Sequence, residues 1–196
     1  MEIIHFHFEE LVSTNDWAKE QINTFDQKRL TVITADKQIR ARGQYGRTWI
    51  SPEKCNLTAS FCFFLKGSDG IAMTHLMALS LIKMLEKRGV HARIKWPNDL
   101  LVEGKKIAGI LGETIPLSGQ IAIIVGVGLN INVDQEVLKT IDQPATSLLL
   151  ETGKRMDIQE ILRELEEQFA TSLETYQKEG FAPFETSFHH YLLPRK

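Results

Sequence analysis

The chain has 196 residues, 43% of them hydrophobic and 24% charged, which is ordinary for a globular protein with one sizeable core. We therefore expect a single domain over residues 1–196. A net charge of −2 excludes a general binder of nucleic acid or of anionic membranes, so any phosphate site must be local. The sequence shows no secretory signal or membrane span, and Cys55 and Cys62 lack the partners of a metal site or of a disulfide framework. A cytoplasmic protein fits these features best.

The N-terminal part predicts two strands separated by a helix. Residues 3–8 and 31–35 are typical of strands, and one apolar side of the helix between them comprises Trp17, Ala18, Ile22 and Phe25. Ser13 or Thr14 caps this helix. Free backbone N–H groups at a helix N-terminus can bind a ligand, although capping alone explains both side chains equally well.

An arginine- and glycine-rich stretch follows at residues 37–52. It has no apolar period of two or 3.6, which predicts a loop. Glycines let the backbone approach a ligand closely, and arginines present planar donor pairs to phosphate or carboxylate oxygens. Tyr45 and Trp49 add flat surfaces for a purine. A solvated surface loop explains such a stretch taken alone, so the anion-binding interpretation depends on motifs further along the chain.

The middle of the chain predicts a buried helix among short strands. The expected elements are strands at 56–65, 93–96 and 100–103, a helix at 71–88, and a further strand from Lys105. Pro97 ends the strand before it, Asn98 and Asp99 form a turn, and Gly104 indicates a hairpin.

Two neighbouring strands carry a pocket signal. At 121–133 every odd position is apolar, whereas the even positions from 126 onward are Gly126, Gly128, Asn130 and Asn132. We interpret one face as core and the other as open space edged by amides, because glycines inside a strand often mark the close approach of a ligand. Lys106 is predicted to share a face with Ala108 and Gly112 and to reach into the same pocket. A lysine that blocks pairing at a sheet edge explains Lys106 equally well in isolation.

The last part of the chain predicts helices. Residues 136–146 form a loop or short helical turn, and Asp157 caps a long amphipathic helix that Gly180 ends. A last helical face comprises Phe181, Phe184, Phe188 and Tyr191.

Seven short motifs occur in the order found in biotin protein ligases. Any one of them is weak, but seven in order between about residues 10 and 150 are highly specific. They lie at 13–15, Gln38, 42–49 with 51–52 and 56–57, 95–99, 105–111, 126–130 and 145–148. The chain therefore resembles biotin protein ligase. The resemblance implies an α/β (α+β) fold related to class II aminoacyl-tRNA synthetases, with a mixed β-sheet flanked by helices.

The resemblance also implies two reactions. Biotin and MgATP give biotinyl-AMP and pyrophosphate, and a lysine of a biotin carboxyl carrier protein, from acetyl-CoA carboxylase or a related carboxylase, then takes the biotin. Fixed cations are needed because a carboxylate attacks a polyanion. No nucleic acid or membrane partner is expected, and a homodimer is allowed because edge-to-edge dimers occur in related proteins.

Matching the motifs assigns the site residues. The catalytic candidates are Lys106, which spans the biotin carboxylate and the α-phosphate, and Arg42. The candidates for binding biotin are Ser13, Thr14, Asn15, Gln38, Arg42, Gly43, Lys106 and Gly109. The candidates for binding the nucleotide are Gln44, Arg47, Trp49, Asn98, Asp99 and Asn130. Trp49 lies against adenine, and Asn130 is also a candidate contact for Mg²⁺.

The chain departs from the family pattern at Ala41, Gln44 and Lys54-Cys55, where glycine, arginine and glycine are usual. It is also expected to lack the N-terminal DNA-binding domain and the small C-terminal domain of some relatives. One alternative is a lipoate ligase or octanoyl transferase of the same fold, against which the motifs at 95–99 and 105–111 argue. The other is a non-catalytic module that binds biotin or its adenylate, and the retention of Lys106, Arg42, Arg47 and Asn130 argues against it.

We predict that Gln44→Arg slows the release of biotinyl-AMP. A neutral amide removes one fixed positive charge from the set that holds the phosphate, and a lost charged hydrogen bond typically costs roughly 1.5–3 kcal/mol. The check is the dissociation rate of the intermediate, formed with labelled biotin, from both proteins at the same salt concentration. Equal rates, or faster release by the arginine variant, would contradict the prediction.

Overall fold

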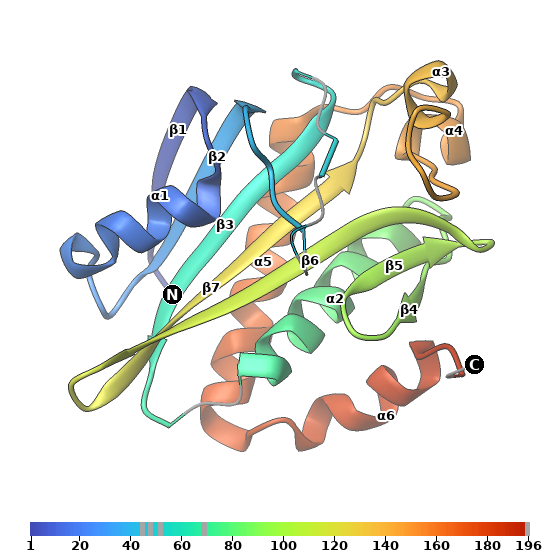
Figure 1. Cartoon of the computed structure of the whole chain (residues 1–196). Coiled ribbons are helices and arrows are strands. Elements are labelled where there is room, and N and C mark those ends of the chain that lie inside the picture. Colours follow the sequence, from blue (N-terminus) through green and yellow to red (C-terminus); the bar gives the residue numbers. More distant parts are fainter. Residues whose placement is uncertain (44–45, 47–48, 51–52, 68–69, 195–196) are drawn as a thin grey trace.

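Figure 1 shows the computed structural model of the chain, which describes residues 1–43, 46, 49–50, 53–67 and 70–194. Within these residues the strands form one seven-stranded sheet in the order β1-β2-β3-β7-β6-β5-β4. β1 and β2 are parallel and the other neighbours are antiparallel, so the mixed sheet expected from the resemblance is confirmed. The strands are β1 (Ile3–Leu11), β2 (Leu30–Gln38), β3 (Asn56–Leu65), β4 (Arg93–Lys95), β5 (Asp99–Val102), β6 (Lys105–Leu117) and β7 (Gln120–Asn130).

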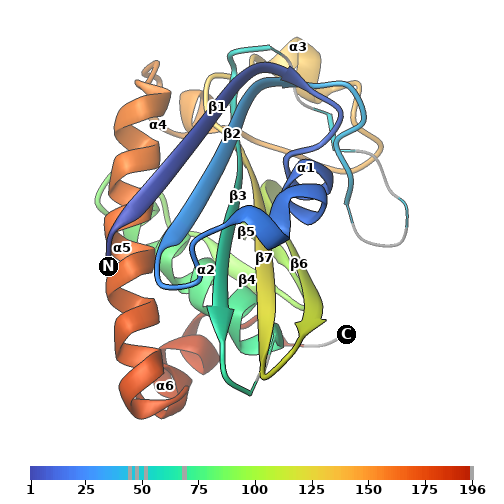
Figure 2. The same ribbon diagram turned by 90° about the vertical axis from the view of Figure 1, so that its left-hand side faces the viewer.

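The helices cover the two faces of this sheet unequally. Figure 2 shows the long helix α5 on one side of the sheet and the short helix α1 on the other. The helices are α1 (Thr14–Gln21), which continues as a 3-10 turn (Ile22–Thr24), α2 (Gly70–Glu86), α3 (Gln135–Leu138), α4 (Leu148–Thr152), α5 (Ile158–Glu179) and α6 (Ala182–Tyr191). Among the described residues, none of these helices combines the length and the apolar character needed to span a bilayer.

The central strands β3 and β7 sort their side chains between these two faces. Odd-numbered residues such as Phe61, Phe63 and Val125 join the large core beneath α2 and α5. Even-numbered residues form a small apolar cluster with α1, including Cys62 and Ile124. Further along that second face the even positions become Asn56, Thr58, Ser60, Gly126, Gly128 and Asn130. The α1 face is therefore apolar at one end and polar at the other.

Most predicted elements are present, and the differences lie at their ends. The two N-terminal strands extend to Leu11 and Gln38, because β1 and β2 pair along their whole length. β7 ends at Asn130, so the strand predicted at 121–133 is too long. Asn132 does not edge the pocket: its amide donates to Met156 O at 2.8 Å and accepts from Met156 N at 2.9 Å. Its role is to connect the chain after β7 with the start of α5.

A register shift between β5 and β6 determines the direction of Lys106. Leu100 pairs with Ala108 but Leu101 pairs with Lys106, so Ile107 is one extra residue on β6. Such a bulge redirects a side chain. Ile107 and Ala108 are both in the large core, and Lys106 lies instead on the face of Gly109.

The prediction that Lys106 shares a face with Ala108 and Gly112 is therefore wrong. A Cβ added at Gly112 would lie 2.4 Å from Thr74 of α2, on the opposite side of the sheet from the α1 face. Strict alternation along the strand does not hold across the bulge.

The buried Glu166 of α5 predicts a pH dependence of stability. Burial raises its pKa to about 7 from the ordinary value of 4.5, with Arg163 lowering it and Glu167 raising it. The folded chain binds the Glu166 proton more tightly than the unfolded chain does. Protonation of Glu166 therefore stabilises the fold fully below about pH 4.5, and this stabilisation is lost as the pH rises toward 7, at up to about 1.4 kcal/mol per pH unit.

We expect Glu166→Gln, which cannot ionise, to avoid this loss. Denaturant unfolding of both proteins at pH 5 and pH 8 checks the prediction. The variant should gain more stability over the wild type at pH 8 than at pH 5. Equal differences at the two pH values would contradict it.

Candidate active site

A cavity of about 800 Å³ opens over the polar end of the α1 face, a size usual for a small-molecule site. Its wall includes residues from the start of α1, the chain after β2, and strands β5, β6 and β7. It brings together the predicted residues Ser13, Thr14, Asn15, Gln38, Arg42, Gly43, Trp49, Asn98, Asp99, Lys106, Gly109 and Asn130. The other two candidates, Gln44 and Arg47, lie outside the described residues.

The indole ring of Trp49 lies directly over two paired glycines. Gly109 of β6 and Gly128 of β7 are register partners. A Cβ at Gly128 would be 2.5 Å from the indole, and one at Gly109 would be 3.1 Å from it. Only glycine leaves room for this ring. The face predicted to be open space is therefore covered here by Trp49, whose buried Nε1 has no hydrogen-bond partner in the described part of the chain.

Lys106 points into the cavity beside this ring. Its Nζ is 2.6 Å from Asp99 Oδ1 and 5.3 Å from the centroid of Trp49, and the Lys106 and Asp99 side chains are only 14% and 12% exposed. The Lys106 backbone donates to Pro144 O at 2.8 Å and accepts from Thr146 N at 2.9 Å. The bulge and these two hydrogen bonds together hold the ammonium group at one end of the cavity.

Two amides are positioned near this cationic end. Asn130 donates its NH₂ to Thr146 O at 3.0 Å, which leaves its side-chain oxygen as the acceptor for another group. Asn98 donates to Ile110 O at 2.9 Å and so connects the turn before β5 with β6. The second amide is used to shape the wall.

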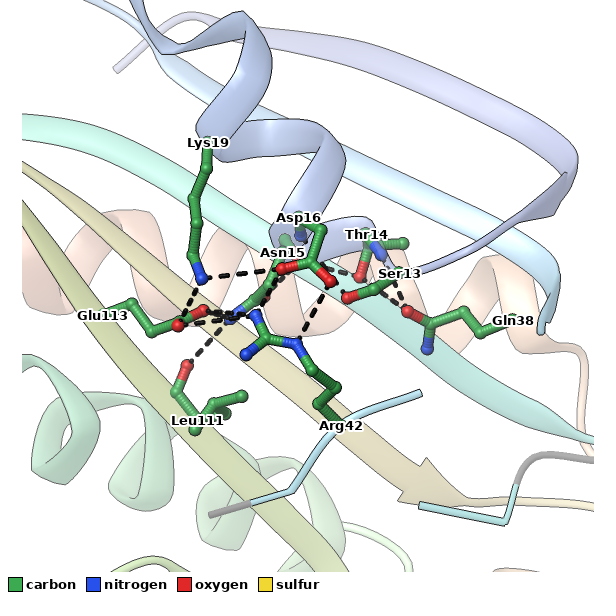
Figure 3. A network of polar contacts seen from close by, with 10 residues as sticks. Ser13, Thr14, Asn15, Asp16, Lys19, Gln38, Arg42, Leu111 and Glu113 are labelled. Carbon is green, nitrogen blue, oxygen red and sulfur yellow. Dashed lines mark hydrogen bonds and ion pairs between the residues drawn. The ribbon is translucent and has the colours of Figure 1, made fainter. Parts of the chain in front are cut away.

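The opposite end of the cavity is formed by neutral polar groups. Ser13 caps α1, with its hydroxyl 3.4 Å from Asp16 N. Thr14 N donates to Gln38 Oε1 at 2.7 Å, and the Thr14 hydroxyl is 2.8 Å from that of Ser60. Figure 3 shows that the Gln38 oxygen faces the start of α1 and its nitrogen faces away. The predicted cap of this helix is confirmed, with Ser13 as the cap, whereas the role of the helix N-terminus in binding a ligand stays a prediction.

A network of charged residues surrounds this neutral end (Figure 3). The Arg42 guanidinium pairs with Asp16 through two hydrogen bonds and lies 3.4 Å from Glu113 Oε2. Lys19 Nζ is 2.5 Å from Glu113 Oε1. Asn15 Nδ2 is 2.8 Å from Glu113 Oε2. Arg42 is thus engaged by two carboxylates of the protein, and its predicted contact with phosphate stays a prediction.

Sequence reasoning missed four members of this network: Asp16, Lys19, Ser60 and Glu113. The alternation of residues along the strands could have indicated two of them, Glu113 and Ser60. Glu113 lies on the β6 face of Gly109, a relationship that was obscured when Lys106 was placed with Ala108. Ser60 is the register partner of Gly126, so the face that predicts a pocket in β7 continues into β3.

The cavity thus has a neutral end rich in donors and acceptors and a cationic end next to an aromatic surface. The sheet, its helices and this cavity define a class II synthetase-like α/β domain with a small-molecule site.

Comparison with known proteins gives the family. The model of the Biotin/lipoate A/B protein ligase family matches residues 8–130, and the chain belongs to this family. The sequence-based resemblance is confirmed.

Individual relatives agree with this result. The biotin protein ligase from Aquifex aeolicus, solved in complex with biotin and ATP, superimposes with a TM-score of 0.81 at 28% identity, covering 97% of this chain and 78% of that chain. The biotin--[acetyl-CoA-carboxylase] ligase of Paracoccus denitrificans is 31% identical over 80% of this chain and 68% of its own length. The bifunctional ligase/repressor BirA of Escherichia coli is 30% identical over 88% of this chain. The chain spans 54% of the BirA length, about half of that relative.

Proposed function

We propose that this chain activates biotin as biotinyl-5′-AMP and transfers it to a lysine of a biotin carboxyl carrier protein. The observation that carries the proposal is the two-ended cavity. Thr14 and Gln38 offer neutral polar groups at one end, and Lys106 offers a partly buried cation at the other. Biotin has the same division, because a ureido ring and a carboxylate lie at opposite ends of the molecule.

In the first step a biotin carboxylate oxygen attacks the α-phosphorus of ATP. The bond between that phosphorus and the bridging oxygen breaks, and pyrophosphate leaves. Lys106 offsets the repulsion between the two anions and the charge that develops in the transition state. Its pairing with Asp99 keeps the ammonium in place until the substrates bind. Trp49 gives the adenine a flat surface beside this cation.

Arg42, together with Arg47, which lies outside the described residues, supplies further positive charge for the phosphates. Arg42 is bound to Asp16 in this structure, so an incoming anion competes with that carboxylate for the guanidinium. This competition exchanges one ionic partner of Arg42 for another, which costs less free energy than leaving a buried charge without a partner.

Mg²⁺ is expected to enter with ATP. The described residues contain no group of three or more His, Cys, Asp or Glu side chains that could hold a metal. Asn130 and Asp99 offer single oxygen atoms, which suits an ion that keeps most of its ligands from phosphates and water. The bound ion would neutralise phosphate charge.

In the second step the carrier lysine attacks the acyl carbonyl of biotinyl-AMP. An amide bond forms, the bond between the carbonyl carbon and the phosphate oxygen breaks, and AMP leaves. The amine loses its proton to Asp99, the carboxylate that pairs with Lys106 at the reacting end.

We also propose a cytoplasmic location, no nucleic-acid or membrane partner, and a homodimer as the assembly to be tested.

The family also includes lipoate ligases, so the choice of biotin depends on the neutral end. A lipoate dithiolane ring has no strong hydrogen-bonding groups and would leave the free lone pairs of Thr14 Oγ1 and the NH₂ group of Gln38 without a partner from the substrate, at a typical cost of about 1–3 kcal/mol for a buried group. The ureido group of biotin satisfies them.

Exchange of label between ATP and pyrophosphate tests the proposal. The purified chain should catalyse exchange that depends on biotin and not on lipoate or octanoate. Exchange with lipoate alone would assign the lipoate activity, and binding of biotin without exchange would assign a non-catalytic module.

We predict that Lys106→Ala slows this exchange by roughly 100- to 1000-fold while the chain stays folded. The side chain lies on the cavity face, so its removal leaves the large core unchanged. Lys105→Ala is the matched control, because Lys105 is the adjacent, exposed lysine and does not line the cavity. Wild-type exchange by a folded Lys106→Ala protein would contradict the assigned role.

A further inference from the structure

We infer that Glu113 is a positioning residue that fixes the direction of a chain of hydrogen bonds running through Asn15 and Ser60 to Thr14. With the hydrogen bonds in this direction, the Thr14 side-chain oxygen is left as an acceptor for an N–H group of the substrate. The inference rests on the proposed function, because it assigns a partner to the ureido ring of biotin. Glu113 itself is not among the residues that line the cavity.

The direction begins at Glu113 because a carboxylate only accepts hydrogen bonds. Asn15 Nδ2 is 2.8 Å from Glu113 Oε2 and 3.4 Å from the backbone oxygen of Leu111, which also only accepts. The NH₂ group of Asn15 must therefore face β6. The opposite orientation would place its oxygen against two acceptors.

The side-chain oxygen of Asn15 consequently faces Ser60, whose Oγ lies 2.5 Å away. Ser60 has one hydroxyl proton and donates it to this oxygen. Ser60 Oγ then accepts from the Thr14 hydroxyl at 2.8 Å, since neither group could otherwise supply the proton between them. The remaining neighbour, Gln38 Oε1, accepts from Thr14 N at 2.7 Å and lies 3.2 Å from the Thr14 hydroxyl, so a Thr14 proton that is not given to Ser60 goes to Gln38 and not into the cavity.

Proton counting therefore leaves Thr14 Oγ1 with lone pairs and no proton for the cavity. Gln38, whose oxygen is occupied by Thr14 N, has its NH₂ group for the cavity (Figure 3). A ureido ring offers both complements, an N–H group for Thr14 and a carbonyl oxygen for Gln38. If these hydrogen bonds ran in the opposite direction, Thr14 would present a hydroxyl proton to the cavity and would not complement the N–H group of the ureido ring.

Close packing holds the side chains of these hydrogen bonds, which we call the relay, in fixed positions. Asn15, Ser60 and Thr14 are all buried, and a Cβ at Gly126 would lie 2.4 Å from Asn15 Oδ1, so the amide lies flat against the strand. On the other side, Lys19 and Arg42 hold the Glu113 carboxylate. The ionic contacts fix Glu113, and Glu113 fixes the amide.

The test distinguishes the role of the Glu113 oxygen as a hydrogen-bond acceptor from the role of its negative charge. Glu113→Gln keeps an oxygen that can accept from Asn15, whereas Glu113→Met has a similar length and no oxygen acceptor. Both lose the negative charge. Glu164→Gln is the control for the loss of an ion pair, because Glu164 pairs with Arg88 at 2.7 Å and has a similar exposure, 27% against 21%, away from the cavity.

The measurement is the KM for biotin and for ATP in the exchange reaction. We expect Glu113→Met to raise the biotin KM by roughly tenfold or more and to leave the ATP KM within about threefold, since one substrate hydrogen bond loses its oriented partner. Glu113→Gln should restore the biotin KM to within about threefold of the wild type. The control should change neither value.

A purely structural role would give a different result. Equal biotin KM values for Glu113→Met and wild type, or equal increases for Glu113→Met and Glu113→Gln, would overturn the inference. If Glu113→Met does not fold, Ser60→Ala interrupts the same relay with a small change and should raise the biotin KM selectively; an unchanged value would overturn it. Failure of the proposed function is distinct, because the wild type itself would then show no biotin-dependent exchange.

Discussion

The site depends on a change from apolar to polar side chains along one face of the two central strands. Below Ser60 and Gly126 this face carries Cys62 and Ile124, which pack against α1 and fix that helix to the sheet. From Ser60 and Gly126 onward the same face carries glycine, hydroxyl and amide groups. A short helix can therefore attach firmly at one end of the face and present its N-terminus over a cavity at the other. The large core beneath α2 and α5 keeps both strands rigid from behind.

Charge balance follows from this arrangement. Three cations near the cavity have acidic partners among the described residues: Lys106 with Asp99, Arg42 with Asp16, and Lys19 with Glu113. A cluster of unpaired cations would repel one another, and the net charge of −2 provides no long-range attraction for anions. The cations are thus held in position at moderate cost and, under the proposed function, become available to phosphates by exchange of partners. This arrangement suits the proposed binding of ATP and release of pyrophosphate.

Much of this could be predicted from the sequence, for identifiable reasons. The alternation in β7 predicted a core face and a pocket face, and Gly126, Gly128 and Asn130 do line the cavity. The direction of Lys106 could not be predicted, because the bulge at Ile107 arises from pairing with β5 and leaves no local signature. The position of Trp49 over Gly109 and Gly128 also depends on contacts between distant segments. Asp16 and Lys19 were missed for the same reason, since their partners Arg42 and Glu113 lie on other elements.

The most direct measurement is a crystal structure of the chain with biotin bound. We expect the ureido ring at the neutral end, with one N–H group within hydrogen-bond distance of Thr14 Oγ1, the carbonyl oxygen facing Gln38, and the carboxylate directed toward Lys106. Biotin bound in the reverse orientation, with its carboxylate at Thr14, or bound outside this cavity, would contradict the assignment of this cavity as the biotin site.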